Sequence, residues 1–394
     1  MADKAHLEHL AESIQQAVVS YDPSNPSSWM PIQDAMEKLR RATEPPAIFV
    51  MKQRFHVHVP FLRDWEITNR STKTVQNICL VAALEMGLLQ TLAARKGENV
   101  TASDLAQASG YDEVLIARIM RLMTAIGFAD ETGYQTYTAN PVTICQSEPG
   151  SIGGMILSNE MTYPLASKIR EYLRQNKPCD MTQTPPPYDF AMGETVWETL
   201  TKNPVWKKGF DDSMTARNKT LSIPWHVKFP VQERLAERQL TTPPVIVDIG
   251  GSQGVDLERF VQHFPDLECE LILQDLPETL ERIPGPLDSK VKPIAYDFFK
   301  EQKVHGADIY YLKSVLHDWD DVSSQKILSN TAKTMKPHSR LLINEIVLAD
   351  TNEALIRTDM DMLMLLLCNG MERTKTQWTE LLAKVEPPLK IVEV

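Results

Sequence analysis

A glycine-rich turn after a buried strand is the first stretch of this sequence that suggests chemistry. Residues 245–249, Val-Ile-Val-Asp-Ile, have the composition of a buried strand, and Gly250, Gly251 and Gly254 follow. From Val255 the apolar residues recur at helical spacing. A strand, a glycine turn and a helix open nucleotide-binding α/β units, in which backbone N–H groups and the positive end of the helix approach a polar ligand.

The positions of the acidic residues indicate which nucleoside such a turn would hold. The dinucleotide pattern G-x-G-x-x-G fits no frame of the loop, whereas Asp248-x-Gly250-x-x-x-Gly254 fits the pattern of S-adenosylmethionine (SAM) sites. SAM has no pyrophosphate, and its amine suits an acidic strand end. Asp275 ends a second short strand about 20 residues further on, where a carboxylate can accept hydrogen bonds from ribose hydroxyls. The alternative is an ordinary glycine turn in another α/β domain.

His317 is the candidate catalytic base, within Leu-His-Asp-Trp-Asp-Asp at 316–321. Methyl transfer from a sulfonium to oxygen requires an aligned acceptor oxygen that has lost its proton. A phenol loses this proton near a pH of about 10, so a neutral imidazole within hydrogen-bond reach is a suitable base. A nearby carboxylate would fix the tautomer of the imidazole, and both Glu345 and Glu372 are candidates for that role.

No metal site is predicted. His56 and His58 alternate in a way that suggests a pair of metal ligands, but no third ligand stands near them in the sequence. The histidines other than His317 are therefore interpreted as ordinary surface or core residues.

The elements that position the candidate residues follow from the alternation of strands and helices after residue 244. Strands are expected at 245–249, 270–274, 291–295, 307–313 and 339–348. Helices are expected from Asp321 to Pro337, with Asp320 as N-cap, and from Thr358 to Leu367. This pattern predicts a doubly wound, Rossmann-like α/β domain.

The carboxyl ends of parallel strands form the ligand-binding edge of such a domain. Asp275, Asp297, His317 and Glu345 each lie at or just beyond the end of an expected strand. The sequence therefore predicts that these four side chains meet in one crevice.

Residues 71–140 have the pattern of a winged helix. An apolar stripe from Val75 to Leu88 indicates one helix, Thr101 caps a second and Asp112 begins a third. Residues 134–138 alternate like one arm of a hairpin. We expect this unit to dimerise and to cover a substrate, since the third helix offers only two arginines to DNA.

We expect three parts in the chain. Residues 1–70 form a helical arm whose second helix is capped at Ser27-Ser28, residues 71–240 a winged-helix-like dimerisation and substrate-covering helical region, and residues 241–394 the SAM-binding domain. Thr241-Thr-Pro-Pro marks the last junction, and the prolines at 185–187 indicate a surface loop. An amphipathic arm before a domain often packs on a second subunit, which favours a homodimer.

Composition excludes several classes of partner. The net charge of −11 over 394 residues argues against nucleic acid, because phosphate binding needs a basic face. No apolar run reaches membrane-spanning length, and the first residues have no apolar signal core. The five cysteines are scattered and odd in number, which is typical of reduced thiols in a cytoplasmic protein.

These motifs together resemble those of the SAM-dependent O-methyltransferases of the plant caffeate/flavonoid type, and within them the fungal secondary-metabolism branch. The matching stretches are Val247-Asp-Ile-Gly-Gly-Ser-Gln-Gly, Asp275-Leu-Pro, Asp297-Phe-Phe, Leu312-Lys-Ser-Val-Leu-His-Asp-Trp-Asp-Asp, Glu345 and Met371-Glu-Arg-Thr. They cover most of 245–375 in family order. The winged-helix region matches the dimerisation domain of the family more loosely.

The resemblance implies a role for each candidate residue. The methionine part of SAM would be surrounded by Gly250, Gly251 and Gly254, and its ribose would be held by Asp275. Asp297 and Phe298 would border the adenine, and Lys313 would lie beside the cofactor. The base would be His317, with Glu345 and Glu372 beside it, and the acceptor would face Phe210, Met214 and Asp318. The product cofactor would be S-adenosylhomocysteine (SAH).

The sequence departs from the family pattern at two places. Ser252 stands where the family has the middle glycine of a triple, which would tighten the loop without abolishing binding. The family also continues with one more strand beyond Lys390-Ile-Val-Glu-Val, so we expect either a shortened chain or a sheet without that strand.

The first functional hypothesis is methylation of a phenolic or enolic hydroxyl of a small metabolite of the polyketide or alkaloid kind. Some fungal relatives resemble these enzymes but use SAM in dehydration or pericyclic ring closure without methyl transfer, and they tend to lose the histidine-based machinery. A SAM-binding regulatory protein is a third reading, which the negative charge disfavours. The small metal-dependent O-methyltransferases match less well, because this chain has a large N-terminal region and a histidine base.

Overall fold

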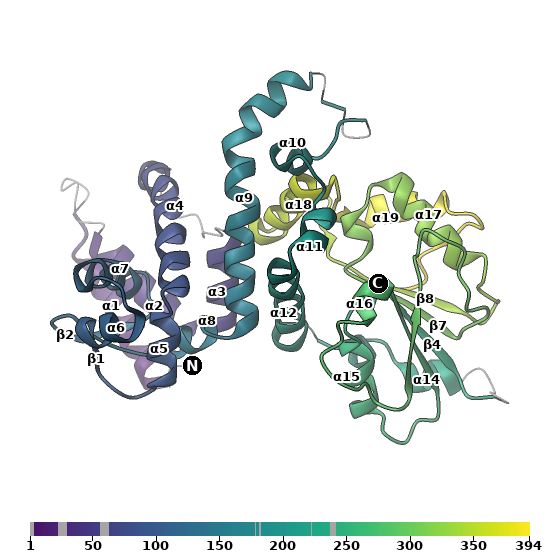
Figure 1. Ribbon diagram of the computed structural model, residues 1–394, viewed down its shortest axis with the longest axis horizontal. Helices are drawn as coiled ribbons and strands as arrows, with labels where there is room; N and C mark the ends of the chain where they lie inside the picture. The colour runs from purple at the N-terminus through teal and green to yellow at the C-terminus, as the bar shows by residue number, and fades with distance from the viewer. Residues whose placement is uncertain are drawn as a thin grey trace. The chain divides into compact units, whose positions relative to one another are not determined.

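The computed structural model describes residues 4–22, 30–55, 63–177, 179–180, 183–221, 223–236 and 242–394. They belong to two compact units, residues 1–155 and 156–394 (Figure 1). The helices between residues 156 and 236 belong to the second unit, and the division expected near residue 240 stays a prediction. The expected cap at Ser27-Ser28, the pair His56 and His58, and Thr241 lie outside the described residues.

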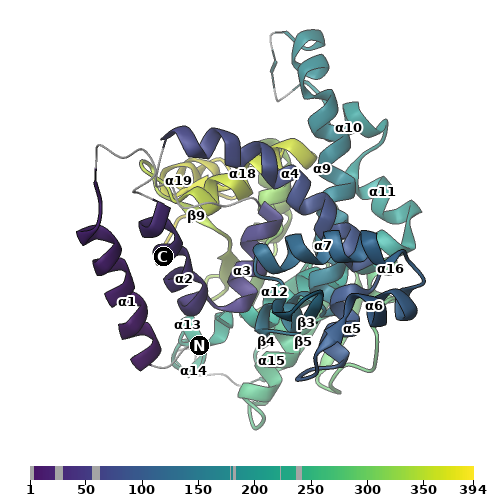
Figure 2. The ribbon, with the colours of Figure 1, turned by 90° about the vertical axis from the view of Figure 1, so that its left-hand side faces the viewer.

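The first unit is helical, with α1 and α2 side by side and one small antiparallel sheet (Figure 2). Its helices are α1 (Lys4–Val19), α2 (Met30–Thr43), α3 (Pro46–Phe55), α4 (Arg63–Glu85), α5 (Leu88–Ala94), α6 (Ala102–Ser109), α7 (Glu113–Ala125) and α8 (Pro141–Gln146). The sheet has the order β1-β3-β2 and consists of β1 (Val100–Thr101), β2 (Asp130–Gly133) and β3 (Thr136–Thr138). Helices followed by a hairpin agree with the expected winged-helix pattern.

Local capping explains where these helices begin. The hydroxyl of Thr101 accepts a hydrogen bond from the Asp104 N–H, and the Asp104 carboxylate accepts one from the Thr101 N–H. Asp112 caps α7, as expected. The single helix expected through Leu88 is wrong, because Gly87 adopts a left-handed φ of 70° after α4 and a new helix begins at Leu88.

Within the described part of the chain, no helix by itself has the length and apolar character needed to cross a bilayer. The segments Lys73–Glu85 and Leu88–Ala94, bent by 58° with respect to each other, meet that requirement only when counted together.

The second unit also begins with helices. They are α9 (Pro149–Gln175, whose first residues belong to the first unit), α10 (Pro187–Met192), α11 (Val196–Lys202), α12 (Pro204–Leu221), α13 (Trp225–Lys228) and α14 (Val231–Ala236). Pro187 was expected in a surface loop but is buried as the first residue of α10. A proline suits that position, since the first turn of a helix needs no N–H donor there.

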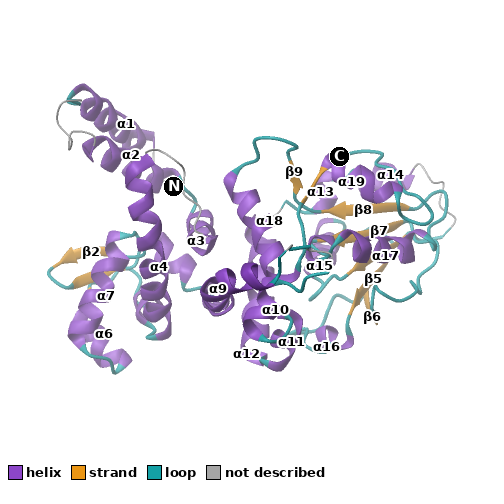
Figure 3. Cartoon of the chain, turned by 90° about the horizontal axis from the view of Figure 1, so that it is seen from above, coloured by secondary structure: helices purple, strands orange, loops and turns teal. Residues whose placement is uncertain are grey.

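A parallel sheet of five strands, in the order β6-β5-β4-β7-β8, forms the centre of the second unit (Figure 3). Its strands are β4 (Val245–Ile249), β5 (Glu270–Asp275), β6 (Val291–Ala295), β7 (Ile309–Lys313) and β8 (Arg340–Asn344). The helices of this part are α15 (Val255–His263), α16 (Pro277–Leu280), α17 (Asp321–Ala332), α18 (Leu355–Cys368) and α19 (Lys375–Ala383). The doubly wound, Rossmann-like prediction is confirmed, and the strand order reverses between β4 and β7.

Alternation along each strand builds a core on both faces of this sheet. In β4, Val247 and Ile249 pack into one apolar cluster, whereas Ile246 packs into the other. Because both faces are covered, the strands read as almost continuous apolar runs.

Two boundaries differ from the sequence prediction. The strand expected over 339–348 is interrupted: β8 ends at Asn344, and β9 (Val347–Leu348) leaves the main sheet to pair in parallel with β10 (Arg373–Thr374). Helix α17 ends at Ala332 instead of continuing to Pro337. The β9–β10 pair matters for function, because it brings the residues before each strand together.

Candidate active site

His317 lies in a short 3-10 turn, Leu316–Asp318, just beyond the carboxyl end of β7. Its side chain is buried, and its Nδ1 lies 2.8 Å from Oε1 of Glu372. Because a carboxylate only accepts hydrogen bonds, Nδ1 carries the proton and donates it. Nε2 is thereby left as the atom that can take a proton from an acceptor. Asp318 Oδ1 lies 3.6 Å from Nε2, beyond hydrogen-bond distance.

The side chain of Glu345 binds the backbone of the same turn. Its Oε1 accepts hydrogen bonds from the N–H groups of Val315 and Leu316, at 2.9 and 2.8 Å. The sequence left open which glutamate orients the imidazole, and the structure gives that contact to Glu372. The other oxygen of each glutamate, Oε2, is buried and has no hydrogen-bond partner among the described residues.

The β9–β10 pair explains how two glutamates far apart in the sequence reach one imidazole. Val347 of β9 pairs with Arg373 of β10. Glu345 stands two residues before the first of these and Glu372 one residue before the second, so both enter the site from the same end of the pair.

Neighbouring carboxylates raise the pKa of the imidazole of His317. Burial by itself lowers the pKa of His317, but Asp318, Glu372 and Glu345 together outweigh it and raise that pKa to about 9. Burial raises the pKa of Glu345 to about 7, against the lowering effects of His317 and of the two backbone N–H groups. An imidazole with a raised pKa keeps a proton on Nε2 as well near neutral pH, and it must lose that proton before Nε2 can act as a base.

The same three side chains are the group within the described residues that has the spacing of metal ligands. One ligand atom from each of His317, Glu345 and Glu372 lies within 4.8 Å of the others. Two of the three side chains, those of His317 and Glu372, already bind each other through a hydrogen bond. The absence of a metal stays a prediction.

The glycine loop lies at the carboxyl end of β4 and requires small residues. Gly250 and Gly254 have left-handed φ values of 72° and 76°. A Cβ on Gly251 would lie 2.5 Å from Leu273 and 2.6 Å from the Asp248 carboxylate, closer than atoms can approach. A Cβ on Gly250 would meet the side chain of Val315 at 2.9 Å and that of Phe298 at 3.9 Å. The loop therefore packs so closely against Leu273, Asp248 and Val315 that only residues without a side chain fit at Gly250 and Gly251.

The backbone N–H groups of this loop serve the protein itself. Those of Gly250 and Gly251 donate to the carbonyl of Gln274, at 2.8 and 3.2 Å, and that of Ser252 donates to Oδ2 of Asp275 at 2.8 Å. These three hydrogen bonds fasten the loop to β5. The approach of the loop's N–H groups to a ligand stays a prediction.

Asp275 connects the loop to the place expected for a ribose. Its two oxygens accept from the N–H groups of Ser252 and Leu276, both at 2.8 Å, and burial raises its pKa. The side chain of Thr279 also bonds this carboxylate, which has about four acceptor positions in all, so it can still accept from a hydroxyl donor. A fixed carboxylate at the carboxyl end of β5 suits the ribose of SAM.

Lys313 forms an ion pair with Asp256, a residue that no sequence motif had indicated. Its Nζ lies 2.8 Å from Oδ2 of Asp256, in the first turn of α15, and both side chains are largely buried. Next to them the pKa of Asp248 is raised well above its usual value, by burial first and then by Asp256. The position of Asp256, two residues after the last loop glycine, was the available signal. Acidic groups here suit the cationic amine of SAM.

Asp297 and Phe298 border the same edge of the sheet. Oδ1 of Asp297 accepts from the Phe299 N–H at 2.9 Å and holds the turn after β6. The ring of Phe298 packs edge-to-face with Trp319, which follows the His317 turn, at a centroid distance of 6.0 Å. The expected adenine border and the catalytic turn are therefore in contact.

The residues expected to face the acceptor lie on α12. Phe210 packs in an apolar cluster with side chains of α9, α10 and α11 and with Leu366, Leu367 and Cys368 at the end of α18. Met214, one turn further along α12, is half-buried. Three residues separate Cys368 from Glu372, so this cluster lies close in sequence to the glutamate that contacts His317.

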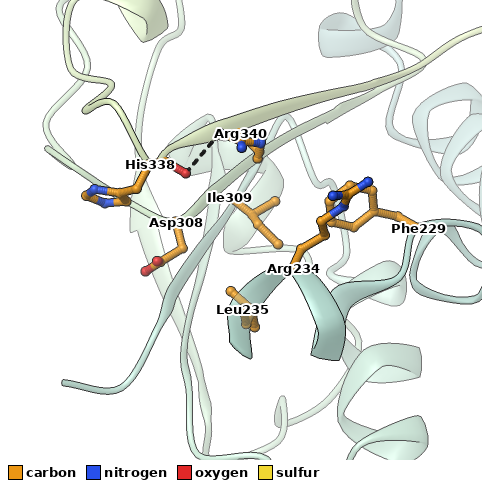
Figure 4. Close-up of a pocket in the computed structure, with 7 residues that line it drawn as sticks. All are labelled: Phe229, Arg234, Leu235, Asp308, Ile309, His338 and Arg340. Atoms are coloured by element: carbon orange, nitrogen blue, oxygen red, sulfur yellow. Dashed lines mark hydrogen bonds between the residues drawn. The ribbon is translucent and has the colours of Figure 1, made fainter. Parts of the chain in front are cut away.

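A small pocket at the opposite edge of the sheet is separate from these residues (Figure 4). It is lined by Phe229, Arg234, Leu235, Asp308, Ile309, His338 and Arg340. Asp308 precedes β7 and Arg340 begins β8, so the pocket lies at the amino ends of strands whose carboxyl ends lead to His317 and Glu345.

Comparison with known proteins identifies both parts of the chain. Residues 165–385 match the family model of the O-methyltransferase domain, and residues 71–145 match that of the O-methyltransferase dimerisation domain. The O-methyltransferase afvC of Aspergillus flavus is 33% identical over 79% of this chain and 75% of its own length. Demethylsterigmatocystin 6-O-methyltransferase of Aspergillus parasiticus is 26% identical over 84% of this chain and 85% of its own.

Solved structures agree with this family. OxaC in complex with sinefungin and meleagrin has a TM-score of 0.72 at 27% identity and covers 97% of this chain and 93% of its own. The LepI complex with SAM has a TM-score of 0.75 at 24% identity, with 97% and 94% covered. At that identity the likeness to LepI shows the fold alone.

Proposed function

This chain belongs to the O-methyltransferase family and uses SAM as its cofactor, and from that premise we propose which acceptor it methylates and how. We propose that it moves the methyl group to a phenolic or enolic hydroxyl of a small secondary metabolite, with His317 as the general base. The observation that carries this proposal is the buried hydrogen bond of 2.8 Å from His317 Nδ1 to Glu372, which leaves Nε2 for the acceptor.

The residues of the chain divide the work of the reaction. Glu372 fixes the tautomer of His317 and stabilises the imidazolium that forms when Nε2 takes the hydroxyl proton. Glu345 holds the backbone of the turn through Val315 and Leu316. Bound SAM supplies an electrophilic methyl group, and transfer to the acceptor oxygen leaves SAH. Alignment of the two reactants supplies much of the remaining rate.

We propose that SAM is held by the residues whose geometry fits it. Gly250, Gly251 and Gly254, which carry no side chain, would let the methionine part approach the backbone closely, and Asp275 would accept from the ribose hydroxyls. Asp297 and Phe298 border the adenine, and Lys313 with its partner Asp256 lies beside the cofactor.

The acceptor surface is proposed from the apolar cluster and its neighbours. Phe210 and Met214 of α12 would face an aromatic or polyketide-type acceptor, and Asp318 would contact its polar edge beside Nε2. The name of the relative that acts on demethylsterigmatocystin and the meleagrin complex of OxaC support an acceptor of this size and kind.

We also propose that the protein is a homodimer and that it is located in the cytoplasm. The match to a dimerisation domain over residues 71–145 supports a homodimer. No disulfide joins any of the five cysteines, all of which lie within the described residues, and this supports a reducing compartment such as the cytoplasm.

The test is incubation of the protein with SAM carrying a deuterated methyl group and a panel of phenolic and enolic metabolites, read by mass spectrometry. We expect a product that carries the labelled methyl group. His317→Ala should lower turnover by about 1,000-fold, within the range of general-base catalysis, while SAH affinity is unchanged. The exposed His305 offers the control His305→Ala, which should leave turnover unchanged. Undiminished turnover in His317→Ala would refute the base assignment.

A second outcome of the same experiment bears on the pericyclic alternative. Isomerised or dehydrated products that form only with SAM, and without the label, would replace methyl transfer by electrostatic use of the sulfonium. The complete pair of His317 and Glu372 favours methyl transfer, since it is the machinery that removes a hydroxyl proton.

A further inference from the structure

Arg373 is the largest fully buried side chain in the described core, and the mechanism above gives it no task. Its exposed fraction is 0%, and its guanidinium packs over the ring of Trp378 at 5.4 Å. A buried arginine is retained only where its N–H donors are satisfied. The partners of those donors therefore show what the residue does.

The guanidinium binds the turn on both sides of His317. Nη1 donates to the carbonyl of Leu316 at 2.9 Å, and Nη2 donates to the carbonyl of Trp319 at 2.8 Å. Nε donates to Oδ1 of Asp321, the first residue of α17, at 3.0 Å. The planar fork of arginine holds these groups at fixed separations, which the single ammonium of lysine does not do.

The backbone next to Arg373 contacts the same turn. The Met371 N–H donates to the carbonyl of His317 at 2.9 Å. A Cβ on Gly370 would lie 2.1 Å from that carbonyl oxygen, so the two backbones touch at a point where only glycine fits. Residues 370–373 thus bind the carbonyls of Leu316, His317 and Trp319 as well as the imidazole.

The turn needs this support because its own hydrogen bonds are long. The bonds from Asp318 N to Val315 O and from Trp319 N to Leu316 O are both 3.3 Å. A short 3-10 turn closed by such bonds has poor geometry of its own. The position of the imidazole is therefore set largely from outside the turn.

We infer that Arg373 is a positioning residue for the methyl transfer, which holds the Leu316 and Trp319 carbonyls so that His317 Nε2 meets the acceptor hydroxyl. This inference rests on the proposed role of His317 as base. It extends that role by assigning the placement of the imidazole to Arg373 and its orientation to Glu372.

The test compares Arg373→Met with Arg373→Lys and with a matched control. A displacement of the base by about 1 Å costs about 100-fold in rate, so Arg373→Met should lower kcat by about that factor while the KM for SAM and the Kd for SAH change less than about twofold. Arg373→Lys should recover part of the loss, about tenfold, because it keeps the charge and one donor. Arg174→Met removes an exposed arginine from the last turn of α9 and should leave kcat unchanged.

A double variant separates positioning from a general structural role. If Arg373 acts through His317, adding Arg373→Met to His317→Ala should cause no further loss of kcat. A further loss of about 100-fold in that background would overturn the inference, and so would wild-type kcat in folded Arg373→Met. If Arg373→Met does not fold, Arg373→Lys decides, since wild-type kcat in that variant overturns the inference.

The same set distinguishes this inference from the proposed function. Full turnover in His317→Ala would overturn both the base assignment and the positioning role. An inactive His317→Ala together with a fully active Arg373→Met would overturn the positioning role alone.

Discussion

The glycine loop and the catalytic turn both place polar atoms at the carboxyl end of one sheet, but they are held in different ways. The loop lies within residues 248–275 and is fastened by backbone N–H groups to Gln274 and Asp275. The turn around His317 is held by side chains from two other segments, those of Glu345 and of residues 370–373.

Under the proposed roles, this difference separates binding from chemistry. Atoms fixed by local backbone geometry would bind the part of SAM that does not react, whereas the atoms that meet the acceptor would depend on side chains brought from a distance. Substitutions in the turn should therefore lower kcat and leave SAM affinity intact, and substitutions in the loop should do the reverse.

The largest effect on kcat is expected from Glu372→Gln, which tests whether the turn acts separately from the loop. An amide can present its donor to Nδ1 and stabilise the wrong tautomer of His317, so kcat should fall about 1,000-fold. SAH affinity, measured by calorimetry, should stay within about twofold of wild type, because the loop is untouched. A parallel loss of SAH affinity would contradict the separation of the two regions.

The next effect is a dependence on pH. The base must be neutral, and the pKa of His317 is about 9 in the protein without ligands, so kcat/KM should rise with pH and level off above that value. Below it, kcat/KM should fall about tenfold for each pH unit. Glu372→Gln should move this limb to lower pH, because it removes a carboxylate that stabilises the imidazolium. A profile that is flat between pH 6 and 9 would argue against a charged resting imidazole.

A smaller effect, on binding, is expected from Asp275→Ala. Loss of a carboxylate that accepts from the ribose and from the Ser252 N–H should weaken SAH binding by about 30-fold. Asp275→Asn keeps an acceptor oxygen for Ser252 and should weaken binding less. In both variants kcat at saturating SAM should stay near wild type, and a kcat loss of the size expected for Glu372→Gln would remove the distinction.

The smallest effect is expected from Ser252→Gly. Ser252 has a left-handed φ of 53°, which costs a residue with a Cβ about 1 kcal/mol relative to glycine. The variant should be more stable by about that amount in chemical denaturation, with kcat unchanged. Ser252→Ala keeps the Cβ and is the matched control, which should show no such gain.

The sequence sufficed wherever neighbouring residues decide the structure. The strands β4 to β7, the glycine turn, the capping box at Thr101 and the N-cap at Asp320 all follow from local composition and spacing. The end of α17 was placed too late, at Pro337, and the break after β8 was not predicted. Apolar residues continue beyond β8 to Leu348, although the strand itself ends at Asn344.

The site was predictable as a set of residues but not as a set of contacts. The ends of parallel strands place Asp275, Asp297, His317 and Glu345 at one edge of the sheet. The choice of Glu372 as the partner of Nδ1 depends on the β9–β10 pair, whose strands are two residues long and carry no pattern of their own. Arg373 was visible beside Glu372 in the sequence, yet its burial is a property of the fold alone.

The β9–β10 pair also determines where this chain can change in length. An insertion of one residue between Glu345 and Val347 would move Val347 out of register with Arg373, and so disturb the pairing that brings the segments of Glu345 and Glu372 together. Residues 349–354, between β9 and α18, contain exposed positions and no helix or strand. We therefore expect this connection to tolerate changes in length and engineered tags. The segment between Glu345 and Val347, a few residues earlier, should not tolerate an inserted residue.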